Sequence, residues 1–140
     1  MFPFTYTFER EIITDKTSDQ VIYTTRDILR EKKVQNILYG PGFVYFNEGF
    51  PRARSNNDYL SLIDDGKFTY NENTKILTYK VKLWKLHLFA FVFLIITMIY
   101  FEGFFGKLLP VFGLLVNHLF SYFGSQGLIE EITHKLNYLS

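Results

Sequence analysis

Short runs of alternating hydrophobic and polar residues fill the first 82 positions of the chain, and one stretch of helical spacing interrupts them. Aromatic residues occupy every second position over 2–8, which predicts a strand with one buried face. Apolar residues from about Ser18 to Lys33 instead recur at helical spacing. Thr17 can cap this helix, and Gln20 stands where a capping box requires it.

Turn residues separate the remaining runs of this part. Strand-like stretches are expected at 34–39, 43–47, 59–63, 68–70 and 75–83, and the first two of these form a hairpin around Gly40-Pro41-Gly42. Asp64-Asp65-Gly66-Lys67 is interpreted as a tight turn. The order β-α-β-β-β-β-β predicts an α+β domain with a small antiparallel sheet of about six strands, covered on one face by one helix.

Two long apolar segments follow, Leu83–Phe101 and Phe104–Phe123. Crossing the hydrocarbon core of a bilayer takes roughly 20 residues of helix, which each segment approaches. Because only Glu102-Gly103 separates them, the pattern predicts a two-helix transmembrane hairpin over 83–124. The second segment contains four polar or helix-disturbing residues, so a re-entrant or interfacial helix is its alternative: Lys107, Pro110, Asn117 and His118.

The second apolar segment carries a stripe of small and polar residues. Its members recur every three or four positions and fall within about 80° of one helix face: Gly106, Pro110, Gly113, Asn117, Ser121 and Gly124. Ala90 and Thr97 share a face of the first segment, together with His87 and Leu94. Small residues allow helices to approach closely in lipid, so these faces are predicted to pair.

Residues 125–140 form a third unit, predicted to be an amphipathic helix with its apolar face on Leu128, Ile129, Ile132, Leu136 and Leu139. Three locations are open for it: the membrane surface, the soluble sheet or a partner protein. Its polar face has few basic residues, which favours docking over lipid binding.

Charge divides the chain in the same way. Of 15 Lys and Arg residues only Lys85, Lys107 and Lys135 follow Leu83, and of 14 Asp and Glu residues only Glu102, Glu130 and Glu131 do. Residues 1–82 are therefore expected to be a soluble cytoplasmic domain. Lysines cluster before the first apolar segment, so both termini are predicted on the cytoplasmic side of a bacterial cytoplasmic membrane. The first residues lack the basic and apolar regions of a signal peptide.

Composition makes several chemistries improbable. The chain has no cysteine, which excludes disulfides, thiolate metal sites and cysteine nucleophiles. A net charge of +1 gives little support for nucleic-acid binding. No catalytic or phosphate-binding motif occurs, and the histidines are too scattered for a metal cluster. Neither an enzymatic activity nor a cofactor or metal is predicted.

Three groups of residues could still carry chemistry. His87 and His118 lie in the apolar segments and could form an intramembrane polar site. The favoured interpretation is simpler: His87 lies at the interface, and His118 makes an inter-helix hydrogen bond or faces a partner. Arg52 and Arg54, in a polar loop, could bind an anion or a lipid head group unless they are simply solvated. Glu102 and Lys107 flank the short link and are interpreted as an ion pair.

The leading hypothesis for function is a non-catalytic accessory or structural subunit of a membrane protein complex, with other membrane subunits or a second copy as partners. A membrane-tethered module that binds a small ligand or an anionic lipid through the two arginines is the alternative. A small proton- or ion-conducting element that uses the two histidines is the third hypothesis.

Overall fold

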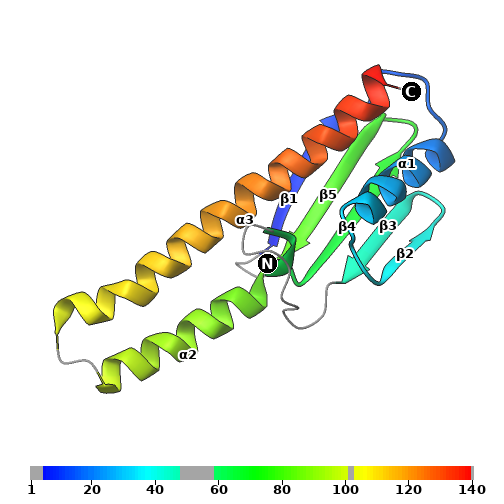
Figure 1. Ribbon diagram of the computed structural model, residues 1–140. Helices are drawn as coiled ribbons and strands as arrows, with labels where there is room; N and C mark the ends of the chain where they lie inside the picture. Colours follow the sequence, from blue (N-terminus) through cyan, green and yellow to red (C-terminus); the bar gives the residue numbers. More distant parts are fainter. Residues whose placement is uncertain (1–4, 48–58, 101–102, 140) are drawn as a thin grey trace.

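The protein is described by a computed structural model that covers residues 5–47, 59–100 and 103–139 (Figure 1). Its described part is an α+β fold with five strands, three α-helices and one 3₁₀ helix. In chain order the elements are β1 (Thr5–Glu11), α1 (Ser18–Glu31), β2 (Ile37–Gly40), β3 (Phe43–Asn47), η1 (Tyr59–Leu62), β4 (Asp65–Asn71), β5 (Ile76–Lys82), α2 (Trp84–Tyr100) and α3 (Phe104–Tyr138).

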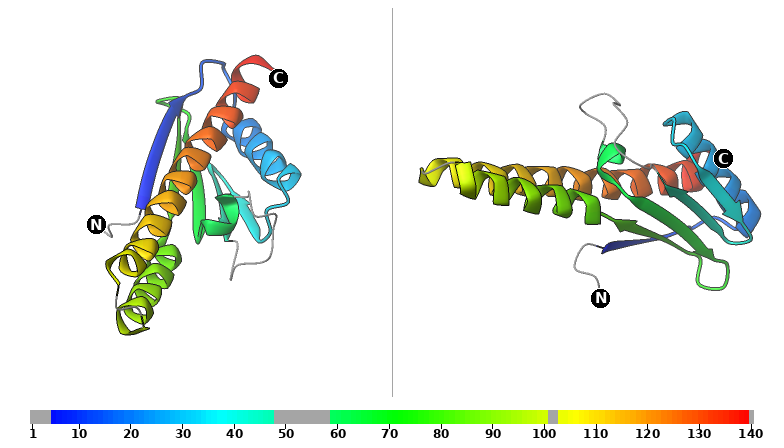
Figure 2. Two further views of the ribbon diagram at one scale, coloured as in Figure 1. Left: turned by 60° about the vertical axis from the view of Figure 1, so that its left-hand side comes forward. Right: turned by 90° about the horizontal axis from the view of Figure 1, so that it is seen from below.

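The strands form one antiparallel sheet in the order β1-β5-β4-β3-β2. Helix α1 lies over the half of the sheet formed by β2, β3 and β4, and the C-terminal half of α3 lies over β1 and β5 on the same face (Figure 2). The hydrophobic core fills the space between this helical layer and the sheet. Its centre is an aromatic row across adjacent strands, in which Phe68 and Tyr79 stack with ring centroids 4.0 Å apart.

Local signals placed several elements correctly. Thr17 caps α1, and its hydroxyl accepts from the Gln20 amide while the Gln20 side chain accepts from the Thr17 amide, so the predicted capping box is confirmed. The hairpin of β2 and β3 is confirmed as well, and Gly42 in its turn has a φ of 72°, which favours glycine. The amphipathic strand at the end of the domain is β5.

The prediction of about six strands is wrong, because Tyr59–Leu62 is a 3₁₀ helix and not a strand. The tight turn expected at Asp64-Asp65-Gly66-Lys67 is also wrong, since β4 begins at Asp65 and pairs on both sides. Gly66 is needed here for close approach: a Cβ atom would lie 2.4 Å from the Phe46 ring and 3.0 Å from the Tyr79 ring.

Residues 125–139 do not form a separate helix. They continue α3, which runs without interruption from Phe104 to Tyr138 and contains Pro110. Four of the five residues of the predicted amphipathic face are nevertheless buried against the domain, since Leu128, Ile129, Ile132 and Leu136 are at most 1% exposed, whereas Leu139 is 71% exposed. The domain is therefore covered by two helices instead of the predicted one, and the second belongs to the apolar segment of the chain.

The predicted two-helix transmembrane hairpin is wrong. Within the described residues only one helix, over Leu108–Tyr138, is long and apolar enough to cross a membrane by length and composition. Helix α2 has 17 residues, about 26 Å of helix, against a hydrocarbon core of about 30 Å. It begins at Trp84 and not at Leu83, because Leu83 is fully buried in the core of the domain.

Candidate functional site

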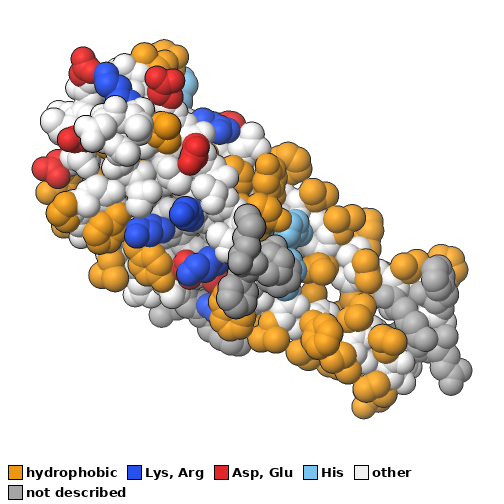
Figure 3. All heavy atoms as spheres, turned by 180° about the vertical axis from the view of Figure 1, so that it is seen from behind, with side chains coloured by type: hydrophobic (Ala, Val, Ile, Leu, Met, Phe, Trp, Pro, Cys, Tyr) orange, Lys and Arg blue, Asp and Glu red, His pale blue; other side chains and the backbone are white. Residues whose placement is uncertain are grey.

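An arm of apolar helix projects from the domain (Figure 1). We call α2 together with residues 104–123 of α3 the apolar arm. Hydrophobic side chains cover its visible surface, whereas the charged side chains gather on the domain (Figure 3). Most large apolar residues of the arm are more than 40% exposed, including Phe91, Ile99, Phe105, Leu109 and Phe112. Exposed apolar area on this scale marks an interaction surface.

The two helices of the arm pack side by side along faces that include some of the predicted pairing residues. Thr97 on α2 and Pro110 on α3 are buried, and Ala90 and Gly106 are half-buried. Asn117 is exposed, and a Cβ on Gly113 would meet no atom within 4 Å. These two stripe residues are therefore not enclosed by α2.

The far end of the stripe contacts the domain instead of α2. Ser121 is fully buried, and its hydroxyl donates to the Asn117 carbonyl of its own helix at 2.9 Å. At Gly124 a Cβ would lie 2.2 Å from Cγ of Tyr59, so only glycine lets η1 approach α3 this closely. One face of α3 thus contacts α2 near its beginning and the domain further on.

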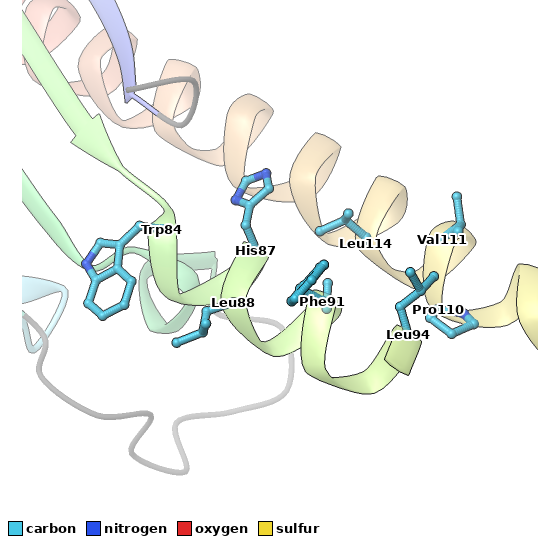
Figure 4. A pocket seen from close by; sticks show the side chains of 9 residues that line it. Trp84, His87, Leu88, Phe91, Leu94, Pro110, Val111 and Leu114 are labelled. Carbon is cyan, nitrogen blue, oxygen red and sulfur yellow. The ribbon is translucent and has the colours of Figure 1, made fainter. Parts of the chain in front are cut away.

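Grooves flank the contact between α2 and α3. The larger has a volume of about 600 Å³, and Figure 4 shows Leu94, Val111 and Leu114 along it, with Trp84 and His87 at the end near the domain. A groove of about 350 Å³ on the other flank is lined in part by Ala90 and Gly113. Among the described residues that line the larger groove, His87 alone has a titratable side chain, so this groove suits an apolar occupant.

A polar cluster forms where the arm meets the domain. The predicted residues His87 and His118 are brought together, with ring centroids 5.3 Å apart and the rings nearly perpendicular. Nδ1–H of His87 donates to the Leu83 carbonyl at 2.7 Å. Nε2 of His118 shares a hydrogen bond with the hydroxyl of Tyr6 on β1, and the Tyr6 ring also contacts Tyr122 edge-on. The cluster ties β1, α2 and α3 to one another.

The start of α2 is held by a carboxylate from elsewhere in the chain. Asp64 is buried, and its carboxylate accepts from the backbone amide of Lys85 at 3.0 Å and lies 3.7 Å from the Lys85 ammonium. Burial raises the pKa of Asp64 above its usual value, and the Lys85 amide and charge oppose that shift. Asp64 therefore acts as an N-terminal cap that fixes the arm to the domain.

Other predicted residues are not part of this junction. Arg52, Arg54 and Glu102 lie outside the described residues, as does the side chain of Lys107, so neither the predicted anion contact nor the ion pair is described. In the part of the chain that the structure does describe, no three His, Asp or Glu residues gather in a way that could hold a metal ion.

Sequence reasoning missed Tyr6 and Asp64. Tyr6 was placed on a strand, but nothing in the sequence pairs it with a histidine 112 positions away. Asp64 was interpreted as a turn residue, and no local signal links it to the amide of Lys85, 21 positions further along the chain. The described contacts of the junction hold the arm to the domain.

Comparison with known proteins adds no assignment. No protein-family model matches the chain, and no curated protein or solved structure is significantly similar to it.

Proposed function

We propose that this chain is a non-catalytic accessory or structural subunit of a membrane protein complex. In this proposal the apolar arm lies in lipid and α3 holds the small α+β domain at the membrane surface. The observation that carries the proposal is the exposure of the arm: Phe91, Ile99 and Phe112 are 61%, 70% and 66% exposed. A soluble monomer rarely presents such a surface.

The proposed location is the cytoplasmic face of a bacterial cytoplasmic membrane. Both β1 and the C-terminal half of α3 pack in the domain, which in this proposal stays outside the lipid on the cytoplasmic side (Figure 1). Lys80, Lys82 and Lys85 precede or begin the arm, and basic residues near membrane-embedded segments favour the cytoplasmic side. Trp84, 49% exposed at the start of α2, suits the interface between lipid and water.

The partner we propose is a helix of another membrane protein or of a second copy. The grooves beside the α2–α3 contact offer places for it, and Gly113 leaves its backbone open to close approach. The titratable groups of the junction already have structural roles, since Asp64 caps α2 and Tyr6 joins β1 to His118. This supports a positioning function over a catalytic one.

A conducting role through the two histidines has less support. Conduction needs polar groups that continue along the arm. The Thr97 hydroxyl, however, donates to the Leu94 carbonyl and that of Ser121 to the Asn117 carbonyl, so both are engaged within their own helices.

The test is purification of the tagged full chain from native membranes in mild detergent, followed by mass analysis of the complex. We expect a stable assembly larger than the monomer, which Gly113→Leu weakens by blocking the open side of the arm. Gly127→Leu, on the docked half of α3 and equally free of neighbours, is the matched control. A monodisperse monomer that carries no other protein would refute the proposal.

A further inference from the structure

No described helix covers the face of the sheet opposite α1 and α3 (Figure 2), and the charged residues of this face differ in sign between its two ends. Lys67 on β4 and Lys80 on β5 are exposed and stand directly opposite each other in the strand register. Lys82 lies on the same face, two residues beyond Lys80 in the direction of the arm, and it pairs with Asp65 in the strand register. At the other end of this face Glu9 and Glu11 are exposed on β1. Positive charge therefore gathers at the end of the face from which the arm leaves.

The lysines of this patch are only partly compensated by their surroundings. Lys82 lies 3.4 Å from Asp65, while Lys67 contacts the ring of Phe43, 5.4 Å from its centroid. Lys80 has no hydrogen bond or ion pair with any described residue. Like charges directly opposite in a sheet repel each other. An anionic partner would relieve this repulsion between Lys67 and Lys80.

The position of the patch indicates which anion meets it. Lys82 precedes Trp84 by two residues, which is about 7 Å along an extended strand, and Lys80 precedes it by four residues, or about 13 Å. A membrane surface at the level of Trp84 therefore lies within about two Debye lengths of both. Figure 3 shows Lys and Arg side chains on this face beside the start of the hydrophobic arm.

We propose that the open sheet face binds anionic phospholipid head groups through Lys67, Lys80 and Lys82. Charge complementarity and the adjoining apolar arm favour a lipid surface over a soluble polyanion. The inference rests on the proposed insertion of the arm in lipid. Because α3 is continuous from arm to domain, binding tilts the whole molecule and brings the open face down toward the head groups.

The test uses the full chain with one fluorophore. Since the protein has no cysteine, Thr7→Cys provides a unique label site, exposed and opposite Lys80 in the register. Energy transfer to an acceptor on lipid head groups is measured in phosphatidylcholine vesicles and in vesicles with about 30 mol % phosphatidylglycerol. We expect greater transfer in the anionic vesicles, and loss of the difference in about 0.5 M NaCl.

Variants separate the proposal from general charge effects. Lys67→Gln/Lys80→Gln is expected to abolish the difference between the two lipids, while it folds at least as stably because a repulsion is removed. Arg30→Gln/Lys33→Gln removes the same charge at the end of α1 and is expected to keep the difference. Equal transfer in both lipids, or a response that survives the first double variant, would overturn the proposal.

Two further outcomes are distinguishable. If a short single-stranded DNA bound to the label face in zwitterionic vesicles as strongly as anionic lipid does, the face would belong to a soluble polyanion and the lipid proposal would fall. If the chain floated with neither kind of vesicle, the proposed insertion of the arm would fail, and this inference with it. Flotation with both but no lipid dependence would overturn only the lysine contact.

Discussion

Replacing Gly124 by alanine tests how tightly α3 is joined to the domain. A Cβ at this position would lie 2.2 Å from Cγ of Tyr59 and 2.6 Å from both Cδ atoms. These atoms are at the base of the ring, so the ring cannot swing aside unless the backbone of η1 moves. Alanine should therefore push η1 away from α3 and loosen the packing between them.

The size of the effect follows from two opposing contributions. Alanine in a helix interior is favoured over glycine by about 1 kcal/mol. Overpacking against a fixed neighbour costs about 1–3 kcal/mol, and three ring atoms in overlap place Gly124→Ala near the upper end. We expect a net destabilisation of about 2 kcal/mol. Gly127→Ala, where a Cβ meets nothing within 4 Å, should instead stabilise by about 1 kcal/mol.

Thermal unfolding of the full chain in mild detergent, followed by near-ultraviolet circular dichroism, measures the difference. About 3 kcal/mol between the two variants corresponds to roughly 12 °C in Tm for a chain of this length. Tyr59→Ala should rescue Gly124→Ala in part, with a coupling of about 2 kcal/mol in the double-mutant cycle. If Gly124→Ala melted at or above Gly127→Ala, the close contact between η1 and α3 would be refuted.

Three other changes test the junction and the core by the same unfolding measurement. Tyr6→Phe removes the hydrogen bond to His118 and should lower the free energy of unfolding by about 1 kcal/mol; no change would show that the bond does not hold β1 to α3. Because the pKa of Asp64 is raised in the folded state, the folded protein binds a proton at this carboxyl more readily than the unfolded chain does. The contribution of Asp64 to the free energy of unfolding therefore increases as pH falls through the folded pKa and is lost above it. Asp64→Asn should remove this dependence from a series of melting curves between about pH 4 and 7 while it keeps an acceptor for the Lys85 amide, and an unchanged pH profile would contradict the assignment. Tyr79 has a fully buried hydroxyl that completes no hydrogen bond with the described residues, although Ser125 faces it, and burial raises the pKa of this hydroxyl well above the usual value. Tyr79→Phe should therefore stabilise the protein by about 1 kcal/mol. A clear loss of stability would mean that the hydroxyl has a partner.

Elements encoded by neighbouring residues were predictable from the sequence. The capping box of α1 needs only Thr17 and Gln20, and the hairpin of β2 and β3 needs only its glycine turn. The strand β5 shows its buried face by simple alternation. In each case the residues that decide the structure lie within one turn or strand of one another.

Residues whose role depends on distant contacts were misjudged. Asp65-Gly66 has the chemistry of a turn, but two aromatic rings from β3 and β5 close over Gly66 and make it part of a strand. Gly124, Ser125 and Gly127 look like a break between two helices. Burial of Leu128 and the residues after it against the sheet continues α3 through them, because packing outweighs the low helix propensity of glycine.

The candidate site was predictable only in part. His87 and His118 were both singled out from the sequence as a possible intramembrane polar site, but only the structure shows that their ring centroids lie 5.3 Å apart. Tyr6 lies 112 positions before His118, and no local sequence pattern predicts the hydrogen bond between these two residues. The start of α2 was placed one residue too early, because an apolar run does not show that Leu83 belongs to the core of the domain.

Helix α3 has 35 residues, which makes a rod of about 52 Å. The N-terminal half of α3 belongs to the arm and the C-terminal half packs on the core of the domain, so arm and domain share one helix. A partner that rotated or lifted the arm would therefore turn the sheet by the same angle. No loop separates the arm from the domain along the described residues of α3, so the two are joined by continuous helix.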